Sequence, residues 1–139
     1  MADKPSPLSK SHFETLAEFR YQMRRFERFS ELAARDAGLT PQQYLLMLQV
    51  KGMPGRDFAL VGELAERLQM QHHGAVALAT RCEAQGLVEK RPGEQDRRQV
   101  QVHLTAQGER LLRRLADLHR AELKSLRGVF AVPQIDLET

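Results

Sequence analysis

The sequence predicts a mainly α-helical fold with one small β-hairpin, and two patterns support this prediction. Apolar residues recur at three- and four-residue steps through two long segments, residues 11–36 and 105–127, as they do in amphipathic helices. In RPGEQDRRQVQVHLT, at residues 91–105, every second residue from Val100 onward is apolar, which is the period of a half-buried strand. A hairpin alone is barely stable in water, so we expect it to pack against the helices.

The composition predicts one folded domain over residues 1–139. Of the 139 residues, 42% are hydrophobic and 28% are charged, which is enough apolar material for a core. No apolar run is long enough to cross a membrane, and the N-terminal MADKPSPLSK lacks the apolar stretch of a signal peptide. The single cysteine, Cys82, excludes an internal disulfide. We therefore expect a cytoplasmic protein with no membrane partner.

The first predicted helix, residues 11–36, carries a long apolar stripe with an aromatic character. The stripe residues that we expect to contact a second subunit are Phe13, Leu16, Phe19, Met23 and Phe26. The stripe is longer than a small core needs, so it favours a partner helix, although packing within its own chain is the alternative. The arginines on the opposite face are expected to be solvated.

The second predicted helix has a clear start and end. Thr40 is its N-cap, Pro41 fits the first helical position, and Gln43 occupies the place of the acceptor in a capping box. Gly52 ends the helix. The short apolar run at 58–60 follows and is expected to form an edge strand.

The middle of the chain alternates short helices and strands. GELAERLQM, residues 62–70, predicts a short helix, and residues 71–85 predict another that ends at Gly86. The strands of the hairpin are expected at 87–91 and 99–105. The long helix at 105–127 then presents the apolar residues Leu111, Leu112, Leu115, Leu118 and Leu123.

This order of elements predicts a winged helix-turn-helix at residues 40–104, between two long helices at 11–36 and 105–127. In a winged helix-turn-helix the second short helix lies in the major groove of double-stranded DNA. The hairpin tip can enter the neighbouring minor groove, whose negative potential attracts arginine. A formal charge of +3 and a pI of about 9.3 are compatible with this partner but are not specific for it.

The candidate DNA contacts lie on the predicted recognition helix and on the hairpin tip. On the helix they are Gln71, His72, His73, Val76, Ala77, Thr80 and Arg81, and on the tip they are Asp96, Arg97 and Arg98. Gln and His can bond base edges or phosphates, and small apolar side chains can meet a thymine methyl. Asp96 is suited to orient the guanidinium of Arg98 by a bidentate bond. Arg81 is expected to bind a phosphate or to pair with Asp96.

Three stretches together resemble the MarR family of bacterial winged helix-turn-helix transcriptional regulators. They are LTPQQYLLML, VGELAERL and RCEAQGLVEKRPGEQDRRQVQVHLTAQGERLL. The resemblance covers roughly residues 19–127, and its most specific parts are LVEKR, DRR and LTAQGERL. It implies a homodimer that reads a pseudopalindromic operator, most often as a repressor. It also implies a small, often aromatic, effector bound between the dimer helices and the winged domain.

The resemblance assigns roles to individual positions and shows two departures. Asp96 and Arg98 match the wing pair by which the family anchors an arginine in the minor groove. Cys82 stands where the family usually has leucine, and the C-terminus is shorter than usual. Dimerisation is therefore expected to depend on the first and last long helices, including Leu115 and Leu118.

Other functions find less support in the sequence. Cys82 falls on the inner side of the recognition helix, so we expect a structural thiol and not a redox sensor. His72 and His73 are neighbours on a helix and point about 100° apart, which makes a shared metal ion difficult. No catalytic motif is present, and no cofactor is expected. The alternative function is a winged-helix module for protein–protein interaction without specific DNA binding.

Overall fold

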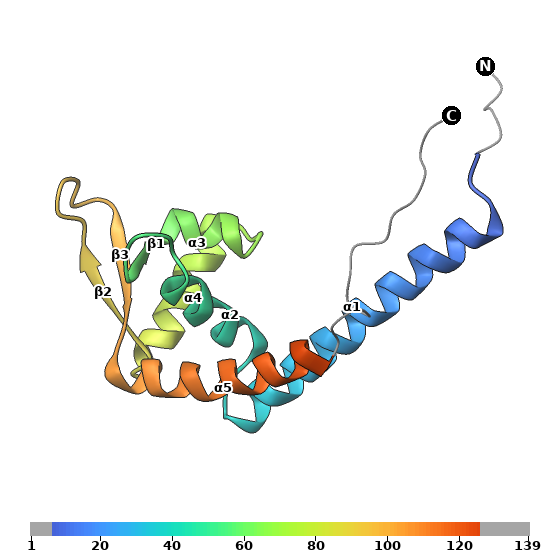
Figure 1. The fold of residues 1–139 in the computed structure, drawn as a ribbon. Helices are drawn as coiled ribbons and strands as arrows, with labels where there is room; N and C mark the ends of the chain where they lie inside the picture. Colours follow the sequence, from blue (N-terminus) through green and yellow to red (C-terminus); the bar gives the residue numbers. More distant parts are fainter. Residues whose placement is uncertain (1–6, 126–139) are drawn as a thin grey trace, which may run out of the picture.

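The computed structural model describes residues 7–125, which fold into five helices and three strands (Figure 1). Their bounds are α1 Lys10–Asp36, α2 Pro41–Lys51, β1 Phe58–Leu60, α3 Val61–Arg67, α4 His72–Ala84, β2 Val88–Pro92, β3 Val100–Leu104 and α5 Ala106–Ser125. The predicted mainly helical fold with a small sheet is confirmed. Residues 126 and 127 of the predicted last helix lie outside the described residues.

Local hydrogen bonds explain where two of the helices begin. Before α2, Thr40 Oγ1 accepts from the N–H of Gln43 at 3.2 Å, and Gln43 Oε1 accepts from the N–H of Thr40 at 2.9 Å. This is the reciprocal capping box that the sequence predicts. Before α5, Thr105 Oγ1 accepts from the N–H of Gly108 at 3.0 Å and donates to the carbonyl of Gly86 at 2.6 Å. Thr105 therefore fixes the start of α5 beside the end of α4.

The sheet has three antiparallel strands in the order β1-β3-β2. Val88 pairs with Leu104 at the base of the hairpin, and Phe58 pairs with His103 across β1 and β3. The sequence predicts an edge strand at 58–60 and a two-stranded wing, but it does not predict that β1 pairs with β3. This pairing satisfies the backbone groups on the second side of β3, which would otherwise form an open edge.

The core lies between α2, α3, α4 and one face of the sheet, and α5 closes it. Its largest fully buried side chains are Leu46, Met47, Leu64, Leu78, Leu115, Val50, Val88, Val102 and Cys82. These residues come from every element except α1 and β1. The strand β1 contributes the smaller Ala59 to the same cluster. A single core therefore holds the helix-turn-helix, the wing and the first half of α5 together.

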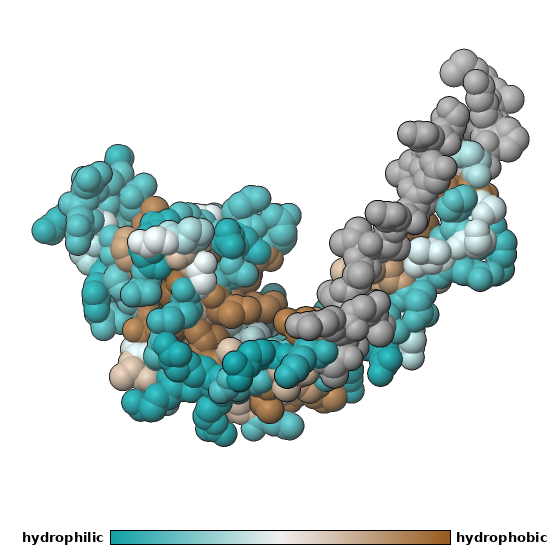
Figure 2. Space-filling view, in the orientation of Figure 1, coloured by the Kyte–Doolittle hydropathy of each residue, from teal (hydrophilic) through white to brown (hydrophobic). Residues whose placement is uncertain are grey.

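The terminal helices give the molecule its open shape. The N-terminal half of α1 extends away from the rest of the chain, while α5 runs beneath the winged-helix body and crosses the C-terminal part of α1 (Figure 1). Hydrophobic surface gathers over α2, in the hollow between this body and α1 (Figure 2). Within residues 7–125, none of the helices is both long and apolar enough to span a membrane.

Candidate nucleic-acid interface

Helix α4 has a buried face and an exposed face. Ala75, Leu78, Ala79 and Cys82 are completely buried at three- and four-residue steps, so they fix the rotation of the helix on the core. The exposed residues include all those predicted as DNA contacts on this helix, namely Gln71, His72, His73, Val76, Ala77, Thr80 and Arg81. Packing of one face thus presents the other to solvent as a continuous polar and small-residue surface.

The turn between α3 and α4 sets the angle at which α4 begins. The N–H of Met70 donates to the carbonyl of Ala65 at 2.9 Å, and that of Gln69 donates to the carbonyl of Glu66 at 3.1 Å. Gln69 has a φ of 52°, in the left-handed region, so α3 ends abruptly. At Gly74, a Cβ would lie 3.1 Å from Met70 Cε, so this glycine leaves room for the Met70 side chain.

The wing tip is closed by backbone hydrogen bonds. The N–H of Gly93 donates to the carbonyl of Gln99 at 2.7 Å, and that of Gln99 donates to the carbonyl of Asp96 at 3.1 Å. A Cβ at Gly93 would overlap the backbone oxygen of Asp96, so the tight loop requires glycine at this position. The loop therefore holds Asp96 and the following arginines in a defined place.

Asp96 pairs with Arg98 on the tip. Asp96 Oδ1 accepts from the backbone N–H of Arg98 at 3.0 Å and from its Nε at 3.2 Å, while Arg98 Nη2 lies 3.5 Å from Asp96 Oδ2. The Arg98 side chain is 92% exposed, so the guanidinium is oriented by the carboxylate yet open to solvent. Arg97 is also exposed. Asp96 therefore pairs with Arg98. Within residues 7–125, Asp96 makes no hydrogen bond to Arg81, which the sequence gives as an alternative partner.

A groove of about 430 Å³ separates α4 from the wing. Its lining residues are Leu60, Val61, Gly62, Glu63, His72, Val76, Lys90, Arg98, Gln99 and Val100. It brings His72 and Val76 of α4 to the same surface as Arg98 of the wing. Apolar side chains, the basic residues His72, Lys90 and Arg98, and the acidic Glu63 share this groove.

Two residues of this surface are not predicted from the sequence. Lys90 Nζ donates to Thr80 Oγ1 at 2.6 Å, and the backbone N–H of Lys90 donates to Glu83 Oε2 at 3.0 Å. Both contacts join β2 to α4. The sequence predicts Lys90 in a strand and Glu83 in a helix, but it contains no signal that these two elements meet at these residues.

Part of the positive charge on the wing is paired internally. Arg91 Nε donates to Glu89 Oε1 at 2.6 Å, and this hydrogen bond lowers the pKa of the Glu89 carboxyl from its ordinary value. Burial, followed by the charge of Arg91, lowers the pKa of His103 on the neighbouring strand. Arg91 of β2 is therefore paired with an acid of its own strand, as Arg98 of the tip is paired with Asp96.

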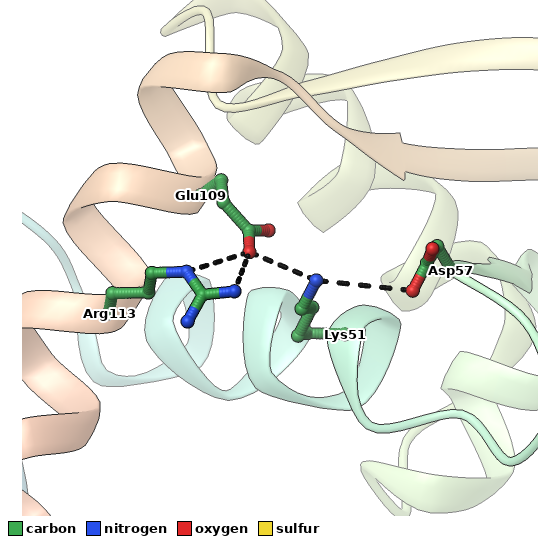
Figure 3. A network of polar contacts seen from close by, with 4 residues as sticks. All are labelled: Lys51, Asp57, Glu109 and Arg113. Carbon is green, nitrogen blue, oxygen red and sulfur yellow. Dashed lines mark hydrogen bonds and ion pairs between the residues drawn. The ribbon is translucent and has the colours of Figure 1, made fainter.

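A network of charged residues joins α5 to α2 (Figure 3). Glu109 Oε1 of α5 lies 2.9 Å from Lys51 Nζ of α2 and accepts from Arg113 Nε at 3.0 Å. Lys51 Nζ also lies 3.9 Å from Asp57 Oδ1, in the loop before β1. The hydrogen bond from Lys51 is the main cause that lowers the pKa of Glu109. The network thus connects the start of the last helix to the winged-helix body.

A second cavity, of about 340 Å³, lies between α1, α2 and α5. Its lining residues are Phe26, Ser30, Tyr44, Leu45, Leu48, Ala116, His119, Arg120 and Leu123. The His119 ring stacks on the Tyr44 ring, with centroids 4.7 Å apart. Its Nδ1 lies 2.7 Å from the carbonyl of Leu115 and its Nε2 lies 2.7 Å from Ser30 Oγ. Because the carbonyl can only accept, Nδ1 carries a proton, and the Ser30 hydroxyl, which can donate or accept, is the partner of Nε2.

The residues predicted for dimerisation differ in exposure. Phe13, Leu16 and Leu118 are 54%, 40% and 52% exposed. The others on α1, Phe19, Met23 and Phe26, are half-buried, and Phe26 packs edge-on against His119 of its own chain. Leu115 is 2% exposed and belongs to the core of its own chain. The side chain of Leu115 is therefore already covered, whereas those of Phe13, Leu16 and Leu118 are not.

Cys82 is completely buried, which confirms its expected place on the inner side of α4. Burial raises the pKa of its thiol from 9.0 to about 11. Since the thiolate is the reactive form, this environment disfavours oxidation. Among residues 7–125, the structure contains no group of three His, Cys, Asp or Glu residues that could hold a metal ion.

The fold and this surface define a class, that of winged helix-turn-helix proteins with long helices on either side of the winged body. A model of the MarR family matches residues 37–99, the segment from the end of α1 to the wing tip. The resemblance to the MarR family expected from the sequence is confirmed by this match. None of the curated proteins compared with the chain matches it.

Several solved structures share the fold. AbsC, a MarR family transcriptional regulator from Streptomyces coelicolor, has a TM-score of 0.75 and 23% identity, with 93% of this chain and 86% of AbsC covered. A MarR family protein from Bacillus stearothermophilus has a TM-score of 0.73 and 19% identity, over 89% and 85% of the two chains. A cysteine-to-serine mutant of MarR from E. coli, solved with operator DNA, has a TM-score of 0.64 and 20% identity, over 73% and 71%.

Proposed function

We propose that the protein is a DNA-binding transcriptional regulator that reads double-stranded DNA with α4 in the major groove and the wing in the minor groove. The observation that carries the proposal is the position of the exposed face of α4 beside the wing. His72 and Val76 on the helix and Arg98 on the wing line one groove. Such a surface can follow a DNA strand from one groove into the next.

The DNA group that each residue is suited to contact follows from its side-chain chemistry. The polar residues at the start of α4, from Gln71 to His73, are suited to base edges and phosphates. Val76, Ala77 and Thr80 are small enough to approach bases closely. Arg81 is suited to a phosphate, and the oriented, exposed Arg98 is suited to the minor groove, with Arg97 adding charge beside it.

We also propose that the regulator acts as a homodimer. Phe13 and Leu16 on α1 and Leu118 on α5 expose large apolar side chains on the two terminal helices. Exposed apolar surface of this kind is typical of a protein interface. Two copies joined through these helices would present two α4 helices to a pseudopalindromic operator, whose half-sites mirror the symmetry of the protein.

A small aromatic effector is proposed to bind the cavity between α1, α2 and α5 and to release the protein, a repressor, from its operator. The Tyr44–His119 stack gives this cavity an aromatic wall, and Arg120 lines it as a basic residue. The cavity lies where the terminal helices meet the winged body. A ligand that binds better to one arrangement of these parts would shift the spacing of the two α4 helices.

The test is selection of bound sequences from a library of random DNA duplexes, followed by titration of the enriched duplex at several salt concentrations. We expect a half-site repeated with approximate two-fold symmetry. The logarithm of the association constant should fall linearly with the logarithm of salt concentration. A library that shows no enrichment would contradict the proposal and favour a winged-helix module for protein–protein interaction.

A further inference from the structure

One acidic residue lies on the side of α4 that faces the wing. Glu83 Oε2 accepts from the backbone N–H of Lys90 at 3.0 Å. Lys90 belongs to β2, which is an edge strand of the sheet. The N–H of an edge strand has no strand partner on its outer side, so Glu83 supplies the acceptor that a further strand would otherwise provide.

A second contact reinforces the first at the preceding turn of the helix. Lys90 Nζ donates to Thr80 Oγ1 at 2.6 Å, and Thr80 Oγ1 in turn donates to the carbonyl of Val76 at 2.9 Å. Lys90 thus bonds through its backbone to Glu83 and through its side chain to Thr80. One residue of the wing is held at two places on α4.

The charge of Glu83 is unfavourable for a surface that binds DNA. A carboxylate near phosphates lowers the affinity for DNA through repulsion, so the charge of Glu83 does not favour DNA binding. We propose that Glu83 is a positioning residue: through Lys90 it holds the wing at a fixed distance from α4, so that Arg98 and the α4 contacts meet DNA together. This inference rests on the proposed DNA-binding function.

Specific and non-specific DNA binding should be affected differently when the contact between Glu83 and Lys90 is removed. Specific binding requires α4 and the wing to fit their grooves at the same time, so it depends on their relative position. Non-specific binding depends mainly on charge. Loss of the Glu83 carboxylate should therefore weaken the first and leave the second unchanged or stronger.

The experiment compares three variants on two probes. The probes are the duplex selected by the wild-type protein from a random library and poly(dI-dC). Glu83→Ala removes both the acceptor and the charge, whereas Glu83→Gln removes the charge and keeps an oxygen that can accept. Glu94→Ala is the matched charge control, because Glu94 is exposed on the wing tip and has no hydrogen bond or ion pair within residues 7–125.

We expect Glu83→Ala to bind the selected duplex about fivefold more weakly, the equivalent of one lost hydrogen bond. Its binding to poly(dI-dC) should be unchanged or tighter. Glu83→Gln should bind the selected duplex at least as well as wild type, and Glu94→Ala should bind both probes more tightly. In the unbound proteins, the amide hydrogen of Lys90 should exchange faster with solvent in Glu83→Ala than in Glu83→Gln.

Two outcomes would overturn the positioning role. One is tighter binding of the selected duplex by Glu83→Ala, because charge alone would then explain the residue. The other is equal weakening in Glu83→Ala and Glu83→Gln, because the acceptor would then be irrelevant. Failure of the wild-type protein to select any duplex would instead overturn the proposed function, and the exchange of the Lys90 amide would still report the contact itself.

Discussion

At the scale of single residues, variants of Asp96 and Arg98 at the wing tip distinguish simple charge attraction to DNA from binding by an oriented arginine. We expect Arg98→Ala to weaken binding of the selected duplex by roughly 1–3 kcal/mol and to reduce the salt slope by about one unit. Asp96→Ala should also weaken it, although it removes a negative charge, because the Asp96 carboxylate orients the Arg98 guanidinium: Arg98 Nε donates to Oδ1 and Arg98 Nη2 lies 3.5 Å from Oδ2. Fluorescence anisotropy on the selected duplex measures both.

The double variant completes this comparison. Without its arginine, Asp96 has nothing to orient, so the double variant should bind no more weakly than Arg98→Ala alone. Because Asp96 also accepts from the backbone N–H of Arg98, circular dichroism must show that each variant is folded. Tighter binding by Asp96→Ala would reject the orienting role and leave the wing as a basic patch.

A second residue-scale prediction concerns Cys82. Its complete burial and its pKa of about 11 keep the thiol protonated at neutral pH. We therefore expect micromolar peroxide to leave DNA binding of the wild-type protein unchanged, and Cys82→Ser to behave in the same way apart from lower stability. Release of the wild-type protein by peroxide, with Cys82→Ser still bound, would contradict this structural role.

At the scale of helices and strands, local patterns in the sequence predict most of the fold. The capping box at Thr40 and Gln43 and the alternation from Val100 to Leu104 each depend on residues a few positions apart. Such patterns are decided by backbone hydrogen bonding and by one buried face, so they can be recognised in the sequence. The exposed face of α4 follows in the same way from its buried face.

Contacts between distant elements could not be predicted in this way. The pairing of Phe58 with His103 depends on where the loop before β1 carries the chain, and the hydrogen bond from Lys90 to Glu83 depends on the angle between β2 and α4. Leu115 shows the same limit. An apolar residue on an amphipathic helix can face the core of its own chain or a partner subunit. Leu115 faces the core of its own chain and is 2% exposed.

The junction of α5 with α2 gives an element-scale prediction with a pH dependence. Glu109→Gln should lower the free energy of unfolding at pH 7 by about 0.5–1 kcal/mol, the upper range for partly exposed ion pairs. Lys51 lowers the pKa of Glu109, so this stabilisation is fully present above the ordinary value of 4.5 and is lost as the pH falls through the lowered pKa. At about pH 3, well below that ordinary value, the difference in stability between wild type and variant should therefore be smaller than at pH 7.

Urea unfolding at both pH values measures this difference. Asp117→Asn is the control on the same helix, because the pair of Asp117 with Arg120 is exposed and stays within α5. It should change stability little at either pH. An equal loss for Glu109→Gln at pH 7 and near pH 3 would show that the carboxylate charge is not responsible.

At the scale of the whole molecule, the shape of the chain leaves α1 with little support of its own. The N-terminal half of this helix extends away from the winged body (Figure 1), and large apolar side chains on it are exposed. An isolated helix is marginally stable in water, since most helical stability comes from packing of an apolar face. A second copy that packs along α1 would supply that packing and would also fix the distance between two α4 helices.

Two aromatic residues of α1 allow a matched test of the dimer. Phe13 and Tyr21 are both 54% exposed, but Phe13 lies on the apolar stripe, whereas Tyr21 lies on the basic face beside Arg25. Phe13→Glu should weaken dimerisation, because it places an unpaired charge in the interface, and Tyr21→Glu should not. A change at Phe26 would be harder to interpret, because Phe26 packs against His119 of its own chain. Sedimentation at micromolar concentration should find wild type and Tyr21→Glu dimeric, and a wild-type monomer would reject the dimer.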